Sequence, residues 1–284
     1  MREIIGVGKN RRIPLMKTEN LTTNYTERGT GPPLVFIHGG WLSEKMWRNQ
    51  IERFEGDYRV ITYDIRGHGQ TGGSPKSTYS IDLFAEDLRR LLANLSVEMP
   101  VLCGLSLGGM IAQKYASRYA NDVSGIILAN TVQSFPPLSL THAQKELLFP
   151  KIQRHLMLYG LGPQLYFRLS FPFFQLSQGH QWISLERDTR NYVLRDVDRI
   201  RTDEFVKIFD AMYNCDLRDD IQIANPTLVI TSDHEHHAVR KQNVQITKNI
   251  RNSSHIEIPD AGHLVNMDNS RAFNSKVNEF LSRL

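Results

Sequence analysis

Residues Val101-Leu-Cys-Gly-Leu-Ser-Leu-Gly-Gly-Met110 join an apolar run to a helical pattern through the pentapeptide Gly104-Leu-Ser-Leu-Gly108. A Gly-x-Ser-x-Gly sequence between a strand and a helix is typical of a sharp turn that lifts the serine above a parallel sheet. The two glycines allow the strained backbone that this turn requires. The free N–H groups of the following helix then point toward a group that reacts at Ser106. Ser106 is therefore the candidate nucleophile.

The sequence on both sides of this turn alternates short apolar runs with helical patterns. Such alternation is typical of a parallel sheet covered by helices, and near-continuous Val, Ile and Leu fits strands that are buried on both faces. We expect eight strands, at residues 3–6, 21–26, 33–38, 58–64, 100–103, 125–129, 226–230 and 255–258. We expect helices at residues 44–54, 80–95, 107–118 and 271–284. The predicted fold class is α/β, with a mostly parallel eight-stranded sheet flanked by helices.

The strand-helix rhythm stops between about residues 135 and 225. This stretch has a helical, aromatic-rich pattern that includes Tyr166-Phe-Arg-Leu-Ser-Phe-Pro-Phe-Phe174. Roughly ninety residues are too many for a connecting loop, so we expect a helical lid, or cap, over the carboxyl edge of the sheet. The predicted domains are a core of residues 1–134 and 226–284 and a lid of residues 135–225, inserted after the sixth strand. Aromatic side chains of the lid either pack on the sheet or line a pocket.

Composition argues against several classes of protein. The 284 residues are 40% apolar and 23% charged, which is typical of a globular chain. The 34 Lys and Arg against 30 Asp and Glu give only +4, and the basic cluster at residues 9–12 has no interleaved aromatics, so we expect no nucleic-acid partner. No signal-peptide pattern or long apolar run appears, so we expect no membrane partner and a cytoplasmic location. Cys103 and Cys215 are expected to be buried free thiols.

A serine hydroxyl needs a base within hydrogen-bond reach, and the base needs an orienting acid. His263 is the candidate base, because it follows the last predicted strand and Gly262 lets the backbone turn close to the site. Two carboxylates, Asp233 and Glu235, follow the strand predicted at 226–230. Both are candidates for the acid.

His234, His236 and His237 surround these two carboxylates. A dense run of His, Asp and Glu resembles the ligand spacing of a metal site. A metal would compete with the base for the same acid, and no second motif of matching spacing stands elsewhere in the sequence. We therefore predict no metal and no cofactor, and we interpret these histidines as loop residues at a pocket mouth.

With nucleophile, acid and base in this chain order, the sequence resembles the α/β-hydrolase fold superfamily over almost its whole length. The resemblance implies a Ser-His-acid triad. It aligns Ser232 with a glycine of the family and so places Glu235 at the acid position, where relatives usually carry aspartate. The sequence thus departs from the family twice, with Ser for Gly and Glu for Asp. Glu235 is the preferred acid and Asp233 the alternative.

The resemblance also extends to the loop Ile37-His-Gly-Gly-Trp41, which matches the family's His-Gly loop. It implies an oxyanion hole formed by the N–H groups of Gly40 and Leu107, with Trp41 sharing the role of Gly40. Residues 64–71 match the family's Asp-x-Arg-Gly-x-Gly turn, which we interpret as architectural rather than chemical. Trp47 is expected to pack under the His-Gly loop.

The sequences around Ser106 and His263 look like those of the lid-bearing esterase and lactonase branch, and in particular of enol-lactone hydrolases. We therefore expect a cofactor-independent serine hydrolase, of the carboxylesterase or lactonase type, that cleaves a small hydrophobic ester or lactone through an acyl-enzyme. C–C bond, amide and thioester hydrolysis and perhydrolysis also use a serine, and these activities stay open. A slow-turnover small-molecule receptor on the same fold is the alternative from another class. The oligomeric state is not predicted.

Overall fold

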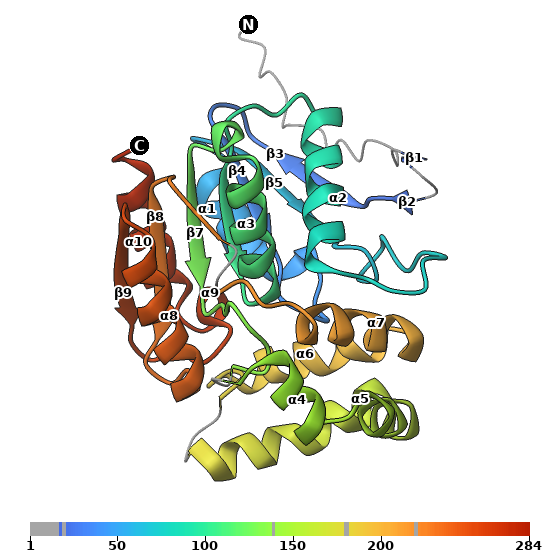
Figure 1. Ribbon diagram of the computed structural model, residues 1–284. Coiled ribbons are helices and arrows are strands. Elements are labelled where there is room, and N and C mark those ends of the chain that lie inside the picture. The colour runs from blue at the N-terminus through green and yellow to red at the C-terminus, as the bar shows by residue number, and fades with distance from the viewer. Residues whose placement is uncertain (1–16, 19–20, 138–139, 179–181, 219–220) are drawn as a thin grey trace, which may run out of the picture.

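The main sheet of the protein is mostly parallel, as predicted. The computed structural model describes residues 17–18, 21–137, 140–178, 182–218 and 221–284. Within them, seven strands follow the order β3-β5-β4-β6-β7-β8-β9 (Figure 1). They are Tyr25–Arg28 (β3), Pro33–Ile37 (β4), Arg59–Tyr63 (β5), Val101–Leu105 (β6), Gly125–Ala129 (β7), Thr227–Ser232 (β8) and Ser253–Ile258 (β9). In this sheet β3 pairs antiparallel with β5, and the other neighbours pair parallel.

The described part of this sheet thus has seven strands where eight were predicted. The strand predicted at residues 3–6 lies outside the described residues, as does the basic cluster at 9–12. The strand predicted at 21–26 is divided, because Leu21–Thr22 (β2) pairs with Lys17–Thr18 (β1) in a separate ribbon, whereas β3 begins at Tyr25. Between β2 and β3 the N–H of Asn24 does not pair with a strand but donates to Thr71 Oγ1.

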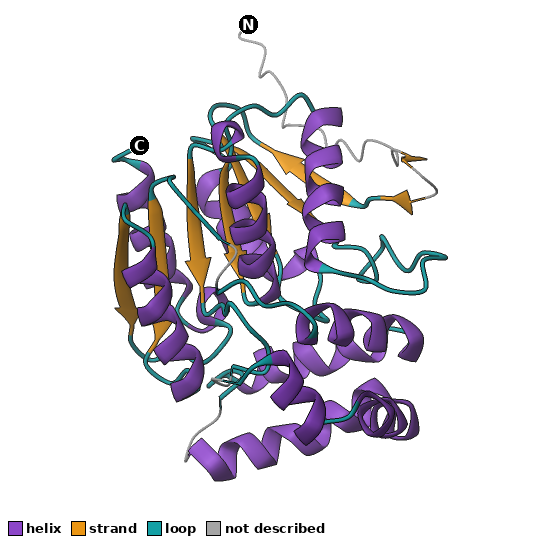
Figure 2. Cartoon of the chain, in the orientation of Figure 1, coloured by secondary structure: helices purple, strands orange, loops and turns teal. Residues whose placement is uncertain are grey.

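Helices cover both faces of the sheet (Figures 1 and 2). One face carries α2 and α3, which contact each other, and the other carries α1 and α10, which also meet. The core helices are Glu44–Trp47 (η1, a 3-10 turn), Arg48–Phe54 (α1), Ile81–Asn94 (α2), Leu107–Arg118 (α3), Ala120–Asp122 (η2, also 3-10), His237–Asn249 (α8), Val265–Asp268 (α9) and Ser270–Leu281 (α10). The four predicted helices are therefore present, with ends shifted by a few residues.

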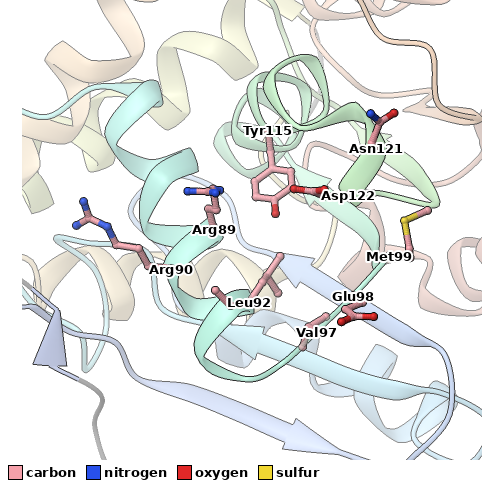
Figure 3. Close-up of a pocket in the computed structure, with 10 residues that line it drawn as sticks. Arg89, Arg90, Leu92, Val97, Glu98, Met99, Tyr115, Asn121 and Asp122 are labelled. Atoms are coloured by element: carbon pink, nitrogen blue, oxygen red, sulfur yellow. The ribbon is translucent and has the colours of Figure 1, made fainter.

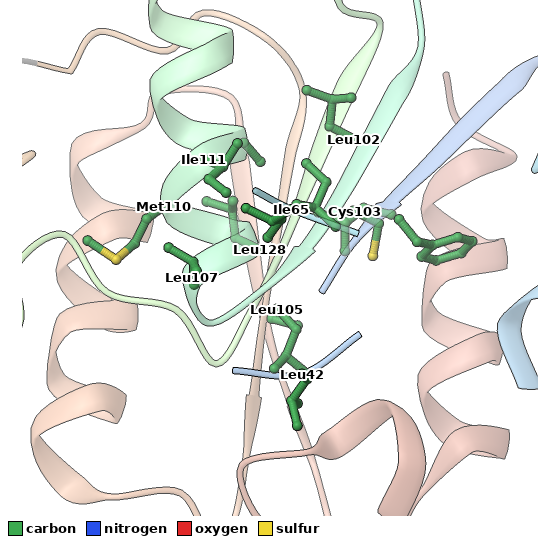
Figure 4. Close-up of a cluster of buried hydrophobic side chains, with 14 of the residues drawn as sticks. Leu42, Ile65, Leu102, Cys103, Leu105, Leu107, Met110, Ile111 and Leu128 are labelled. Carbon is green, nitrogen blue, oxygen red and sulfur yellow. The ribbon is translucent and has the colours of Figure 1, made fainter. Parts of the chain in front are cut away.

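The apolar core covers both faces of β6. Figure 4 shows Leu102, Cys103 and Leu105 of β6 together with Met110 and Ile111 of α3, and these side chains are fully buried. Such contacts remove apolar surface from water, which stabilises the fold by about 25 cal/mol for each Å² of apolar surface that is buried. Burial raises the pKa of the Cys103 thiol, so this side chain is an unreactive part of the core.

The turn at residues 64–71 is architectural, as predicted. The Asp64 carboxylate accepts hydrogen bonds from the backbone N–H groups of Glu44 and Gln70, each at 2.8 Å. Gly69 is required there, because a Cβ on it would lie 2.3 Å from Asp64 Cγ. Two residues beyond Asp64, the buried Arg66 guanidinium makes two hydrogen bonds, of 2.8 and 2.6 Å, to Asp87 on α2. The turn therefore bonds the end of β5 to η1 and to α2.

The described residues between β7 and β8, where the lid was predicted, form four helices. They are His142–Leu148 (α4), Lys151–Gln178 (α5), Arg187–Asp198 (α6) and Thr202–Tyr213 (α7). Figure 1 places them beyond the carboxyl ends of the parallel strands, with α6 and α7 nearer the sheet and α4 and α5 farther away. The helix α5 is broken at Gly162, which has a φ of 72°. No helix in the described ranges is both long enough and apolar enough to cross a bilayer.

Candidate active site

Ser106 lies in the predicted sharp turn between β6 and α3. Its φ of 54° and ψ of −115° are strained for a residue with a side chain, and its place at the N-terminus of α3 matches the prediction from the pentapeptide. The turn is held on both sides, because the Ser106 N–H donates to Ala129 O at 2.9 Å and Thr131 Oγ1 donates to Ser106 O at 2.6 Å. The end of β7 therefore supports the strained residue.

The glycines of the pentapeptide are required by close backbone contacts. A Cβ on Gly108 would lie 2.1 Å from Ile37 O, at the end of β4, and a Cβ on Gly104 would lie 2.2 Å from Gly108 O. The first turn of α3 therefore packs directly on the loop that follows β4. Leu107 is the first residue of this helix, so its N–H has no partner within the helix.

The His-Gly loop lies against this helix end. A Cβ on Gly40 would be 3.8 Å from Leu107 Cβ, so Gly40 and Leu107 are neighbours, as an oxyanion hole formed by their N–H groups requires. The next residue, Trp41, has a φ of 61° and a buried side chain. Its indole stacks on Phe205 of α7, with ring centroids 4.9 Å apart, and meets the edge of Phe167 of α5 at 5.3 Å.

The partly buried His263 is paired with the buried Glu235. His263 Nδ1 is 2.6 Å from Glu235 Oε2, and the glutamate side chain is fully buried. For a neutral imidazole next to a carboxylate, this contact places the hydrogen on Nδ1 and leaves Nε2 able to accept a proton. The other oxygen, Glu235 Oε1, accepts hydrogen bonds from the His236 N–H at 2.7 Å and from Trp182 Nε1 at 2.5 Å.

Asp233, the alternative acid, lies elsewhere. Its carboxylate accepts hydrogen bonds from the N–H groups of Asp260 and Ala261, at 3.0 and 3.1 Å, and contacts His234 Nδ1 at 2.8 Å. Burial raises the pKa of Asp233, but the hydrogen bonds from His234 and from these two N–H groups outweigh it and lower the pKa. Asp233 thus braces the loop before His263, whereas Glu235 contacts the histidine itself.

Asn130 links the Ser106 turn to the His263 loop. It follows Ala129, is buried, and has a φ of 41°. Its Nδ2 donates to His263 O at 3.0 Å and to Ser232 Oγ at 2.9 Å. The three turns that carry Ser106, His263 and Glu235 are thereby joined at the carboxyl edge of neighbouring parallel strands. Among the described residues no hydrogen bond joins the Ser106 hydroxyl to His263. Such contacts are often long in ligand-free enzymes and shorten when substrate binds.

Trp182 contacts the His263–Glu235 pair from the helical stretch between β7 and β8. Besides its bond to Glu235, its carbonyl accepts the His263 N–H at 2.8 Å, and its ring lies 5.0 Å from the imidazole, at an interplanar angle of 36°. Neither Trp182 nor Asn130 was predicted as a site residue from the sequence. A polar residue directly after a buried strand is a signal that could have identified Asn130, whereas nothing in the sequence around Trp182 indicates its contacts.

The three histidines around Glu235 have separate structural contacts. His234 contacts Asp233, as described above, and the Nδ1 of His236 accepts the Ala238 N–H at the start of α8. His237 stacks on His236, with centroids 4.7 Å apart. In the part of the chain that the structure describes, no three His, Cys, Asp or Glu side chains are grouped so that they could hold a metal.

A surface pocket of about 520 Å³ lies away from these residues (Figure 3). Arg89, Arg90, Tyr115 and Asp122 line it together with Met99. Met99 precedes β6, whereas Ser106 follows β6, so the pocket lies at the opposite edge of the sheet. It includes none of the candidate site residues.

Two histidines at the His-Gly loop are buried, namely His38 of the loop itself and His68, which packs against it. His38 Nδ1 contacts Gly39 O at 2.7 Å and its Nε2 accepts the Ile65 N–H at 3.0 Å, so the ring is neutral. Burial lowers the pKa of His38 to about 4. The pKa of His68 is lowered to about 3, mainly by burial and to a smaller extent by the neighbouring His38. The two rings meet edge to face at 4.9 Å.

Comparison with known proteins agrees with this architecture. A family model for the α/β hydrolase fold matches residues 32–270. The 3-oxoadipate enol-lactonase 2 of Acinetobacter baylyi is 25% identical over 271 residues, which cover 94% of this chain and 96% of that protein.

Solved structures show the same fold at low sequence identity. An esterase from Thermogutta terrifontis with malate bound superposes with a TM-score of 0.78 at 23% identity, over 97% of this chain and 99% of that one. The enol-lactonase from Burkholderia xenovorans LB400 superposes with a TM-score of 0.72, also at 23% identity, over 95% of this chain and all of that one.

The lowered pKa values of His38 and His68 predict that the free energy of unfolding decreases as the pH is lowered. The unfolded chain protonates these rings near pH 6.5, whereas the folded chain does so only near pH 4 and 3, so the unfolded state binds more protons in between. The stabilisation is complete above pH 6.5 and is lost as pH falls through this window. For His38 it amounts to on the order of 3 kcal/mol.

Urea denaturation at pH values between about 7.5 and 5 tests this prediction. His68→Gln, which removes one ring, should flatten the slope of unfolding free energy against pH. His142→Gln is the matched control, because His142 is exposed and its loss should leave the slope unchanged. Equal slopes in the wild type and His68→Gln would contradict the prediction.

Proposed function

The chain belongs to the α/β hydrolase fold family, and on this basis we propose that it is a serine hydrolase that cleaves a small hydrophobic carboxylic ester or lactone. The observation that carries the proposal is the contact of His263 with the buried Glu235, at 2.6 Å, linked through Asn130 to the strained turn of Ser106. A serine presented at a helix N-terminus beside a histidine and a carboxylate is the arrangement that acyl transfer requires. The enol-lactonase and esterase relatives support this substrate class.

In the proposed mechanism, Ser106 Oγ attacks the carbonyl carbon while His263 Nε2 takes the hydroxyl proton. Glu235 holds the imidazole and stabilises its positive charge. The negative charge that develops on the carbonyl oxygen is bound by the N–H groups of Leu107 and Gly40, with Trp41 N–H as the alternative to Gly40. The tetrahedral intermediate then expels the alcohol, which receives the proton from His263. Water hydrolyses the acyl-enzyme by the same steps.

The proposed lid, residues 135–225, favours an apolar substrate. Phe167 and Phe205 pack on Trp41, next to the proposed oxyanion hole. Met212 of α7 approaches the same loop, since a Cβ on Gly40 would lie 3.4 Å from its sulfur. An apolar wall of this kind suits a hydrophobic acyl or alcohol group and disfavours a highly charged one.

A fluorophosphonate probe tests the nucleophile. We expect a single adduct on the wild type by intact mass, none on Ser106→Ala, and steady turnover of a short-chain aryl ester. In Ser106→Ala the turnover should fall by about 10⁴-fold or more. An adduct that persists in Ser106→Ala would exclude Ser106 as the nucleophile. Neither adduct nor turnover in the wild type would contradict the proposal and favour a ligand receptor on the same fold.

A pair of isosteric substitutions tests the acid. Glu235→Gln removes the charge beside His263, so kcat should fall by about 10³-fold to 10⁴-fold. Asp233→Asn alters only the brace of the neighbouring loop, and we expect kcat to stay within about ten-fold of the wild type. Steady-state kinetics on the same aryl ester measure both. The reverse order of effects would assign the acid to Asp233.

Trp182→Phe tests whether this residue positions the acid. The substitution keeps an aromatic ring against His263 but removes the N–H that donates to Glu235. We expect kcat to fall by about ten-fold with little change in KM, because a hydrogen bond to a charged group contributes about 1.5–3 kcal/mol. Trp47→Phe is the control, since the buried Trp47 indole N–H has no hydrogen-bond partner among the described residues. Equal kinetics in the two variants would exclude the positioning role.

A further inference from the structure

The outer helices between β7 and β8 expose an unusual amount of apolar surface. Of the thirteen large hydrophobic side chains that are exposed in the described residues, ten lie between positions 147 and 176. Leu176 is 88% exposed and Ile152 is 77% exposed. We call this surface the α4–α5 face, which consists of Leu147, Leu148, Phe149, Ile152, Leu156, Met157, Tyr159, Leu165, Leu169 and Leu176. Contiguous exposed apolar surface generally marks a binding surface.

Most of these side chains follow the period of a helix. Before the break at Gly162, Ile152, Leu156 and Tyr159 have the spacing i, i+4, i+7. After the break, Leu165, Leu169 and Leu176 have the spacing i, i+4, i+11. Each half of α5 therefore carries an apolar stripe that is exposed rather than packed.

The opposite side of α5 is the packed one. Leu158 is fully buried, and Phe167 contacts Phe205 of α7, with ring centroids 6.0 Å apart. Helix α5 also contacts α6 as well as α7, and these two helices lie between it and the sheet (Figure 1). The exposed stripes of α5 consequently lie on the side of this helix that is opposite its packed side.

The helix α5 carries cations but no carboxylates, and Glu146 of α4 is paired with Arg154 at 2.9 Å. The chain has 30 Asp and Glu in 284 residues, but none between Glu146 and Glu186. In the same stretch Lys151 and Arg168 are exposed cations. Exposed aliphatic side chains with cations and no carboxylates on the same helix, as on α5, are the pattern of helices that lie in the surface of an anionic bilayer.

We propose that the α4–α5 face docks on an anionic lipid surface, with α5 lying in the plane of the bilayer interface. A second copy of this chain fits less well, because symmetric contact would bring the exposed cations Lys151 and Arg168 together, and Glu146 of α4 is already paired with Arg154. A protein partner also fits less well, since leucine is under-represented among the residues that dominate binding between proteins. The proposal differs from the sequence-based expectation of no membrane partner, because that expectation considered only leader and spanning segments.

Vesicle flotation with the full chain tests this proposal. We expect the protein to float with phosphatidylcholine vesicles that contain one third phosphatidylglycerol, and at least about ten-fold less with phosphatidylcholine alone. The triple variant Ile152→Gln, Leu156→Gln, Leu176→Gln should lose binding by about ten-fold or more, because it removes the most exposed part of both stripes. Lys151→Glu with Arg168→Glu should lose a similar amount.

Matched controls separate this face from general effects of apolarity and charge. Val244→Gln changes an exposed apolar residue of α8, and Lys241→Glu with Arg271→Glu makes the same change in net charge elsewhere. Both should float like the wild type, and thermal melting should show that every variant is folded. No flotation of the wild type, or equal loss in test and control variants, would overturn the proposal. If the wild type does not bind vesicles but sediments as a dimer, and only the triple glutamine variant sediments as a monomer, the face would be assigned to self-association instead. None of these measurements depends on Ser106 chemistry.

Discussion

The close contact between the first turn of α3 and the end of β4 is the constraint on which the site depends. There is no room for a Cβ on Gly108, since it would lie 2.1 Å from Ile37 O. This contact brings the free N–H of Leu107 beside Gly40, because β4 and β6 are neighbours in the sheet. Ser106 lies in the same turn, and its strained φ of 54° has to be maintained by the surrounding structure.

Buried polar contacts provide this support. Thr131 and Ala129 hold the Ser106 backbone from β7, and Asn130, between them, holds the His263 loop. Under the His-Gly loop, the neutral ring of His38 accepts the N–H of Ile65. Buried polar groups are costly unless each has a partner, so such contacts tolerate few alternative arrangements. The precision of the site comes from satisfied hydrogen bonds around it as much as from its own members.

The helices between β7 and β8 have two chemically different sides. Toward the sheet they present aromatic side chains such as Phe167 and Phe205, which pack on Trp41, and near them Trp182 contacts both His263 and Glu235. Away from the sheet α5 presents Leu and Ile to solvent. These helices therefore connect the proposed catalytic centre to the proposed lipid-facing surface. The proposed lid and the proposed triad share contacts through Trp182, so we expect a movement of the lid to alter the geometry of the triad.

The sequence by itself determined the succession of most strands and helices along the chain, the turn at Ser106 and the candidate His263, because these depend on local periodicity and on short spacings of residue types. The candidates Glu235 and Gly40 came from the resemblance to the α/β-hydrolase fold. The residue pattern alone left both Asp233 and Glu235 open as the acid, because they are two residues apart on one loop, and the resemblance only favoured Glu235. Only the tertiary structure pairs Glu235 with His263 and Asp233 with the N–H groups of Asp260 and Ala261. The roles of Trp182 and Asn130, and the exposure of the α4–α5 face, were likewise decided by packing between segments far apart in the chain. Apolar residues at helical spacing read the same in sequence whether their stripe faces a neighbour or solvent, and only the placement of α5 against α6 and α7 distinguishes the two.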